Sequence, residues 1–440
     1  MRIAILAYRG NMQSGGQGIY LHALARELLE RGHQIDCFVG PPYPDPIPGA
    51  RLSTIENQQF WVQRFKRDRS AFLPRPDPFR ILHPLNFYEY AVTRFGFLSE
   101  PFAFSVRAAR EVIARLRKGV RYDIIHDVQS LGYGLLWLRA LGLPVVATIH
   151  HPLTVDRRSS LQRDQCFEEY KGTLTFYPVR SQARVASRLD AVITSSEASA
   201  REIEHGFRVR RDRIFNVLNG VDLPAAGQSR PTPTRPELLF VGRSGDPNKG
   251  LEYLLSALAL LPEGVQLKAL DDYPTGTPLA QQITELGLQN RVHFIGKVSR
   301  AELERAYRGA TLLVVPSLFE GFGLPAIEAL AAGTPVVAAR AGALPEILRT
   351  AGTGMLVPPA DAPALAKGIS ECLADWERQQ RSALAARGQI EACFAWPQVV
   401  ARTERVYREL LRTRRQARAA RDHDHIGERG EAASDPVGSP

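Results

Sequence analysis

Two glutamates separated by seven residues, Glu320 and Glu328, carry the most specific chemistry in this sequence. The apolar run 312–315 before them is typical of a buried strand, and Pro325 suits the first turn of a helix, where its missing N–H is not needed. Glu320 is therefore expected on a loop, within reach of a sugar, and Glu328 one turn into the helix, where it can accept hydrogen bonds from ribose hydroxyls. A glutamate early in a helix is often only a partner of the helix dipole, but two with this spacing are not explained that way.

The segment between the two glutamates is rich in glycine. Glycine lets the backbone approach an anion closely, and the N–H groups at a helix N-terminus favour negative charge. We therefore expect a diphosphate to be bound here, by Gly321, Phe322, Gly323 and Leu324.

Two cations follow another apolar run, 238–241. Arg243 comes directly after Gly242, and Lys249 precedes Gly250 and a helical pattern. We expect both cations at the carboxyl ends of strands, the edge where open α/β sheets bind ligands. A pair of cations there suits a diphosphate, whereas a lone Arg and Lys are more often simply solvated.

Weaker signals lie in the first half of the chain. Gly16 and Gly18 follow the first apolar run, 3–7, and could admit a donor phosphate, although a glycine-rich turn is often only a tight connection. His150 and His151 end a later run, and either ring could face the sugar or be structural. Two further polar residues, which could face an acceptor or be ordinary loop polarity, are Asp127 and Ser130.

Short apolar runs alternate with helical patterns through most of the chain, which predicts an α/β fold with parallel sheets covered by helices on both faces. The runs fall into two series, which predicts two Rossmann-like domains. The first series comprises 3–7, 35–39, 124–125, 145–149 and 191–194, and the second comprises 238–241, 266–270, 292–295, 312–315, 336–338 and 355–357.

The predicted domains are separated by residues 223–237, whose four prolines favour an extended linker. We expect an N-terminal acceptor-binding domain with an aromatic and basic insertion, a C-terminal donor-binding domain, an amphipathic helix that returns to the first domain, and a disordered tail. Their respective ranges are 1–222, with the insertion at about 50–118, then 238–396, 397–415 and 416–440.

The chain has 440 residues and a net charge of +10, which fits contact with polyanions without choosing among them. Its four cysteines show no paired spacing, and no apolar run is long enough to span a bilayer. Residues 51–118 hold 13 Lys or Arg against 6 Asp or Glu, among many aromatics. The insertion is therefore either a solvated lid or a surface that rests on anionic lipid, and we expect a cytoplasmic protein, at the inner face of the membrane if lipid is contacted.

Several motifs in order resemble those of the retaining glycosyltransferases of family four, in the GT-B superfamily. The E-x7-E signature is matched by Glu320 and Glu328, and the resemblance covers nearly the whole predicted folded chain. The other matching segments are Gly15-Gly16-Gln17-Gly18, Thr148-Ile149-His150, Asn219-Gly220-Val221-Asp222, Gly242-Arg243 with Lys249-Gly250, and Ala332-Gly333-Thr334-Pro335.

The resemblance implies a GT-B fold and transfer of a hexose from a nucleotide diphosphate sugar to a glycan or lipid-linked acceptor. It places Gly16 against the donor phosphate, His150 near the sugar, and Arg243 and Lys249 on the diphosphate. It also places Glu320 at the sugar and Glu328 on the ribose. It favours a front-face mechanism, in which the leaving phosphate takes the acceptor proton.

The resemblance further implies that no metal or cofactor is needed, since the two cations stabilise the leaving group instead. The D-x-D form typical of a metal-dependent site occurs only as Asp422-His423-Asp424, in the predicted tail. Other functions remain open: a nucleotide-sugar epimerase, a phosphorylase, or a non-catalytic sugar-nucleotide binder. No nucleic-acid-binding signature is present.

Overall fold

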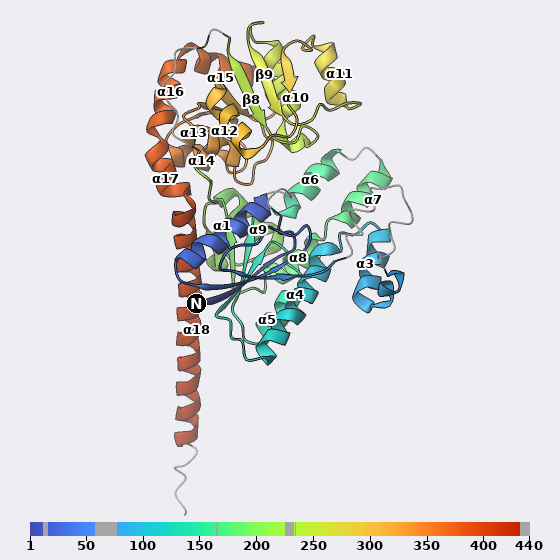
Figure 1. The fold of residues 1–440 in the computed structure, drawn as a ribbon, viewed down its shortest axis with the longest axis vertical. Helices are drawn as coiled ribbons and strands as arrows, with labels where there is room; N and C mark the ends of the chain where they lie inside the picture. Colours follow the sequence, from blue (N-terminus) through green and yellow to red (C-terminus); the bar gives the residue numbers. More distant parts are fainter. Residues whose placement is uncertain are drawn as a thin grey trace, which may run out of the picture. The chain divides into compact units, whose positions relative to one another are not determined.

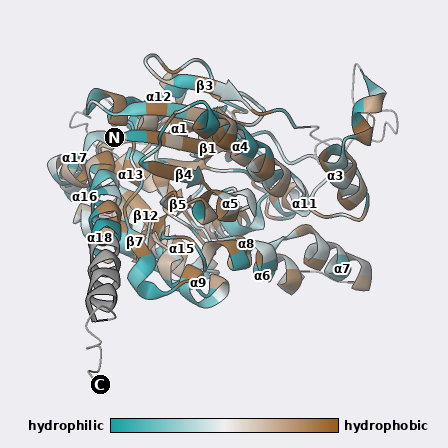
Figure 2. Ribbon diagram, turned by 90° about the horizontal axis from the view of Figure 1, so that it is seen from below, coloured by the Kyte–Doolittle hydropathy of each residue, from teal (hydrophilic) through white to brown (hydrophobic). Residues whose placement is uncertain are grey.

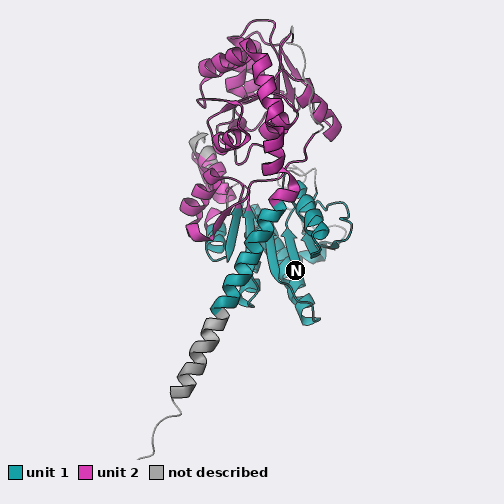
Figure 3. Ribbon diagram, turned by 90° about the vertical axis from the view of Figure 1, so that its left-hand side faces the viewer, with its two compact units in different colours: residues 1–148, 181–193, 400–440 teal, residues 149–180, 194–399 magenta. Residues whose placement is uncertain are grey.

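The computed structural model describes residues 1–11, 16–57, 77–150, 152–163, 166–224, 233 and 235–431. The chain forms two compact units, shown in separate colours in Figure 3. Unit 1 comprises Met1–Thr148, Ser181–Ile193 and Val400–Pro440, and unit 2 comprises Ile149–Arg180 and Thr194–Val399. Most of the predicted linker, residues 225–232 and 234, lies outside the described part.

The first sheet has seven strands in the order β3-β2-β1-β4-β5-β6-β7. Strands β1, β2 and β4 pair in parallel, with Ile3 opposite both Ile35 and Ile124. Figure 2 shows the apolar character of this sheet, which is expected because helices cover both of its faces. The strands are β1 (Arg2–Ala7), β2 (Gln34–Val39), β3 (Arg51–Thr54), β4 (Ile124–Val128), β5 (Val145–Ile149), β6 (Ala191–Thr194) and β7 (Ile214–Asn216).

Helices connect these strands. Those before β6 are α1 (Gly16–Glu30), η3 (Pro78–Leu82), α3 (Pro84–Arg94), α4 (Glu100–Arg117), α5 (Gly134–Ala140), α6 (Leu153–Arg163), α7 (Phe167–Phe176) and α8 (Val179–Ala186). Those between β6 and β8 are α9 (Glu197–Phe207) and η4 (Arg211–Arg213).

The last helix, α18 (Trp396–Glu431), is held in unit 1 by buried polar contacts. His126 bonds the Tyr407 hydroxyl through Nδ1 and Thr148 Oγ1 through Nε2, the latter at 2.7 Å. Glu404 Oε1 lies 2.9 Å from His33 Nε2. The sequence pattern predicts that this helix ends at residue 415, but α18 continues to Glu431. Arginine and alanine, which are frequent in the added stretch, are strong helix formers.

The second sheet has six strands in the order β10-β9-β8-β11-β12-β13. All of its pairings are parallel, so the prediction of two parallel sheets is confirmed. Its strands are β8 (Glu237–Val241), β9 (Gln266–Leu270), β10 (Val292–Phe294), β11 (Leu312–Val315), β12 (Val336–Ala339) and β13 (Met355–Val357).

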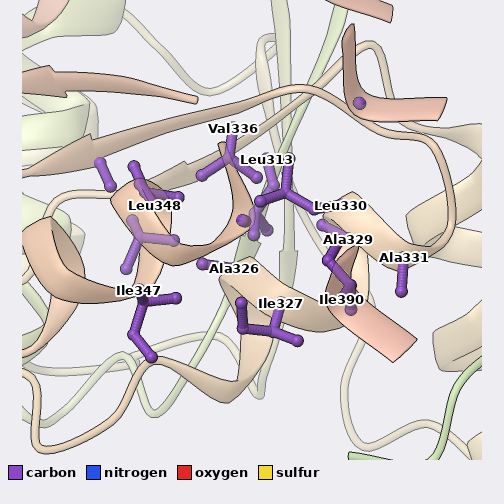
Figure 4. Packing of buried hydrophobic residues seen from close by; sticks show 14 of the residues in the cluster. Leu313, Ala326, Ile327, Ala329, Leu330, Ala331, Val336, Ile347, Leu348 and Ile390 are labelled. Carbon is purple, nitrogen blue, oxygen red and sulfur yellow. The ribbon is translucent and has the colours of Figure 1, made fainter. Parts of the chain in front are cut away.

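Helices cover both faces of the second sheet (Figure 1). On one face Ala326 and Leu330 pack against Leu313 and Val336, as Figure 4 shows. Full burial of each such Leu or Val stabilises the fold by roughly 1.5–3 kcal/mol. The helices are η5 (Pro247–Lys249), α10 (Leu251–Ala259), α11 (Pro278–Glu285), α12 (Arg300–Gly309), α13 (Leu324–Ala331), α14 (Leu344–Ala351), α15 (Ala362–Ala374), α16 (Trp376–Ala385) and α17 (Arg387–Phe394).

Within the described ranges, no helix is both long enough and apolar enough to cross a membrane.

Candidate active site

The loop after β8 carries Arg243, whose side chain is 83% exposed. Its Nη2 lies 3.1 Å from Asp246 Oδ2, while Asp246 Oδ1 accepts the Asn248 N–H at 3.0 Å and thereby caps η5. A cavity of about 410 Å³ adjoins this loop, and Asp156 and Ser160 of α6 also line it. The guanidinium is therefore oriented by one carboxylate and open to a ligand.

Lys249 is brought to the end of β11 by close contact between two loops. Gly250 has a φ of +67°, and a Cβ there would lie 2.1 Å from the Pro316 carbonyl oxygen. Leu318 N donates to Asn248 O at 2.8 Å across the same contact. As a result, Lys249 Nζ lies 2.8 Å from Glu320 Oε2.

Glu320 is fixed through both its side chain and its backbone. Ser317 Oγ lies 3.4 Å from Oε2, and the Glu320 carbonyl oxygen accepts the Ala343 N–H at 2.8 Å. Gly342 is required beside it, because a Cβ at that position would lie 2.1 Å from this carbonyl oxygen. The structure therefore brings together Lys249 and Glu320, two of the four residues predicted to be catalytic.

The N-terminus of α13 begins at Leu324, one residue before the predicted start at Pro325. Gly323, the N-cap residue, has a φ of +94°, a conformation that glycine adopts without strain. Glycine has no side chain with which to cap the helix. In the first turn of α13, Ala326 N donates to the Gly323 carbonyl oxygen at 3.0 Å, and Pro325 has no N–H to donate. Binding of an anion at this helix N-terminus stays a prediction.

Glu328 is nearly buried, with 9% of its surface exposed. Its Oε1 lies 2.5 Å from Arg300 Nη1, and its Oε2 accepts the Tyr307 hydroxyl at 2.9 Å. Burial, with the charge of Glu328, raises the pKa of Tyr307 well above its ordinary value, so Tyr307 stays a donor. Each carboxylate oxygen has two lone pairs, so Glu328 keeps acceptor capacity for hydroxyl groups.

Sequence reasoning missed Arg300 and Tyr307. Both lie on α12, which starts with a capping box formed by Ser299 and Glu302. That signal locates the start of the helix but not the tertiary contact with Glu328.

Gly321 and Phe322 hold the loop through contacts of their own. The Gly321 carbonyl oxygen accepts the Ser196 hydroxyl at 3.0 Å, and Ser195 and Ser199 each approach it at 3.4 Å. Phe322 is buried, with its ring centroid 6.0 Å from that of Phe394. This serine cluster was also missed, because nothing in the sequence links it to residue 321.

His150 directly follows β5 and belongs to unit 2. Burial lowers the pKa of His150 to about 4, against a smaller opposing effect of the hydrogen bond with Asn219. The ring is therefore neutral at physiological pH. His151, the other candidate, lies outside the described residues.

The remaining candidates lie in unit 1. Gly16 opens α1, and at Gly18 a Cβ would lie 2.1 Å from the Asn11 carbonyl oxygen. Asp127 and Ser130 are fully buried and bonded to each other.

Asp127 also shapes the loop after β4. Its Oδ2 accepts the Leu131 N–H at 3.0 Å, and Gln129 and Leu131 have φ values of 58° and 47°. Burial raises the pKa of Asp127 to about 6. Both Asp127 and Ser130 therefore hold a left-handed loop instead of exposing their side chains to an acceptor.

Among the described residues, no group of three or more His, Cys, Asp or Glu side chains is placed to hold a metal ion.

Residues 14–224 match the family model for Glycosyltransferase Family 4, and residues 226–389 match that for Glycosyl transferases group 1. MMP alpha-(1->4)-mannosyltransferase from Mycolicibacterium hassiacum is 35% identical over 421 residues, which are 93% of this chain and 98% of the relative. The chain belongs to glycosyltransferase family 4. The resemblance found in the sequence is confirmed, and the protein is a glycosyltransferase.

Other members and structures are similar to this glycosyltransferase. D-inositol 3-phosphate glycosyltransferase from Mycolicibacterium smegmatis is 34% identical over 298 residues, covering 63% of this chain and 65% of that one. Sucrose-phosphate synthase from Thermosynechococcus elongatus superposes with a TM-score of 0.69 at 24% identity, over 94% of this chain and 99% of that one. HepE from Anabaena, in complex with UDP-glucose, superposes with a TM-score of 0.65 at 21% identity, over 93% of this chain and 99% of that one. These likenesses establish the GT-B fold.

Proposed function

We propose that this glycosyltransferase is retaining and metal-independent, and that it takes its sugar from a nucleotide diphosphate sugar bound by unit 2. The observation that carries the proposal is the Lys249–Glu320 ion pair, 2.8 Å long, next to the N-terminus of α13. A cation, a carboxylate and the positive end of a helix dipole at one sheet edge suit a sugar diphosphate. That HepE was solved with UDP-glucose supports a donor of this class.

In the proposed reaction, Arg243 and Lys249 stabilise the charge that grows on the leaving diphosphate. Glu328 accepts hydrogen bonds from the ribose, and Glu320 from the transferred sugar. His150, held neutral, offers its ring to that sugar. The leaving phosphate takes the proton of the acceptor hydroxyl as the new glycosidic bond forms, so no side chain is needed as general base.

We propose mannose as the sugar and a glycan as the acceptor. This rests on the 35% identity to MMP alpha-(1->4)-mannosyltransferase across 98% of its length. The relatives named D-inositol 3-phosphate glycosyltransferase make a cyclitol phosphate a second candidate acceptor.

The test is to incubate the purified chain with UDP-, GDP- and ADP-sugars, with EDTA present, and to measure nucleotide release with and without mannoside acceptors. Acceptor-dependent release from one donor, with the anomeric configuration retained by NMR, is the expected result. No release from any donor contradicts the proposed donor class, and activity that EDTA abolishes contradicts metal independence.

We further propose that the insertion contacts anionic membrane when the acceptor is lipid-linked. Phe79, Leu82, Phe87 and Phe95 are large and exposed in this segment, which is rich in basic residues. Co-sedimentation with vesicles that contain anionic lipid tests this, and equal binding to neutral vesicles would contradict it.

A further inference from the structure

Unit 1 contains a second cavity, of about 560 Å³, that is built from residues outside the donor site. Thr54 and Glu56, at the end of β3, line one side of it, and residues of η3, α3 and α4 line the rest. The carboxyl edge of a parallel sheet is where α/β folds bind ligands, and this volume is typical of small-molecule sites.

Helix α3 is held against α4 by a small apolar cluster, which fixes the walls of the cavity. Leu85 packs with Ala103 and Val106, and Phe102 adjoins them. The polar residues on the cavity side therefore project from a packed pair of helices.

Arg107 of α4 supplies the first donor. Its Nη2 donates to Asn86 Oδ1 at 2.6 Å and also bonds Glu89, which is buried. Its Nη1 is buried and has no hydrogen-bond partner among the described residues. Arg107 lines the cavity, so its guanidinium group is a candidate donor to a ligand bound there.

Arg110 and His83 add further donors to the same cavity. Arg110 lies three residues after Arg107 on α4, so the two side chains lie on neighbouring positions of the helix surface. His83 Nδ1 accepts the Leu85 N–H at 3.3 Å, which places the proton of a neutral ring on Nε2, as a donor.

Both acidic residues that line the cavity form ion pairs with arginines other than Arg107 and Arg110. Glu56 pairs with Arg80, and Glu111 lies 3.3 Å from Arg115 Nε. Arg110 makes no ion pair with any residue in the described part of the chain. The cavity therefore has an excess of positive charge and of hydrogen-bond donors.

We propose that this cavity binds an oxyanion group, a phosphate or carboxylate, through Arg107, Arg110 and His83. Guanidinium groups bind such groups by paired, charge-assisted hydrogen bonds. The group belongs either to a free anion or to the acceptor. Only the second source rests on the proposed function.

Binding of inorganic phosphate to the full chain, measured by calorimetry at low ionic strength, tests the site without any need for transfer activity. Arg110→Ala is expected to weaken binding by about tenfold or more, the effect of losing a hydrogen bond to a charged group. Arg117→Ala, at an exposed position on the same helix, is the matched control and should leave binding unchanged. Equal affinities for the wild type and Arg110→Ala, or no binding at all, would overturn the proposal.

Arg107→Lys provides a second variant, because it keeps a cation for the buried Glu89 and so protects the fold. Phosphate binding weakened in this variant, at an unchanged thermal midpoint, supports the site, and unchanged binding argues against it.

Transfer assays then separate the two sources, with a mannoside acceptor and its phosphate monoester. If Arg110→Ala raises KM only for the phosphorylated acceptor, the anion is carried by the acceptor. If phosphate binds but neither KM changes, the site holds a free anion. Failure of all transfer would count against the proposed function and leave the binding result standing.

Discussion

Lys249 and Glu320 form an ion pair, Nζ to Oε2 at 2.8 Å, between the loop after β8 and the loop after β11. These strands are neighbours in the second sheet, so two residues 71 positions apart meet at its carboxyl edge. A lysine held in this way is already oriented before a diphosphate arrives, which reduces the reorganisation that catalysis requires.

Lys249→Ala should lower kcat for sugar transfer by about 10²–10³-fold, because one preorganised positive charge at the leaving group is lost. The matched control is Lys268→Ala. Lys268 Nζ also forms an ion pair with a glutamate, 2.7 Å from Glu237 Oε1, and the two lysine side chains are similarly exposed. Lys268 and Glu237, however, lie on strands of the sheet and not on the loops at its edge. Similar losses in both variants would mean that the sheet, not the diphosphate, needs the lysine.

The strands of the second sheet were largely predictable from sequence. Strands β9 and β11 have the predicted limits. Strand β11 is a continuous apolar run, typical of a strand covered on both faces, whereas β9 alternates buried apolar and partly exposed residues. Strand β3 (Arg51–Thr54) was missed because it lies at a sheet edge, is mostly exposed and carries polar residues. Strand β7 is only three residues long, too short to show a pattern.

The candidate site was predictable where topology alone brings residues together. Lys249 and Glu320 each follow a strand of one parallel sheet, so their proximity follows from the fold. The contact of Arg300 with Glu328 does not, because α12 and α13 meet through tertiary packing that no local pattern encodes. Asp127 was assigned to the acceptor side because its burial cannot be read from its sequence neighbours.

Glu328→Gln should raise KM for the donor by about 10-fold or more, because an amide is a weaker acceptor of ribose hydrogen bonds than a carboxylate. The substitution also weakens the ion pair between Glu328 and Arg300, which could itself raise KM. Arg300 Nε forms a second ion pair, 3.3 Å from Glu304 Oε1. Glu304→Gln removes that second ion pair and leaves Glu328 intact. Donor KM measured for both variants should rise only for Glu328→Gln, and an equal rise would assign the effect to the position of Arg300.

Gly250→Ala should impair transfer and destabilise unit 2 by about 1–3 kcal/mol, because alanine is strained at a φ of +67° and its Cβ would meet the Pro316 carbonyl oxygen. Moving the two loops apart also separates Lys249 from Glu320. Gly264→Ala is the control, since a Cβ there meets nothing within 4 Å. Urea unfolding together with kcat measures both effects, and a fully active Gly250→Ala enzyme would show that the loop contact does not position Lys249.

His150 predicts a defined pH dependence of stability. Its pKa is about 4 in the folded chain, below the ordinary value of 6.5, so the unfolded chain binds more protons between these limits. The free energy of unfolding should therefore rise with pH through this window, and the contribution of His150 should be complete above about pH 7. His150→Gln cannot titrate in this range and keeps a polar group near Asn219.

Urea unfolding of the wild type and His150→Gln at about pH 5 and pH 7 tests this dependence. On acidification the wild type should lose stability relative to the variant, by at most about 3 kcal/mol across the full window. NMR titration of the ring should show His150 neutral down to about pH 5. A midpoint near the ordinary histidine value, or parallel pH profiles for the two proteins, would show that the ring is solvated and free to act as an acid in the reaction.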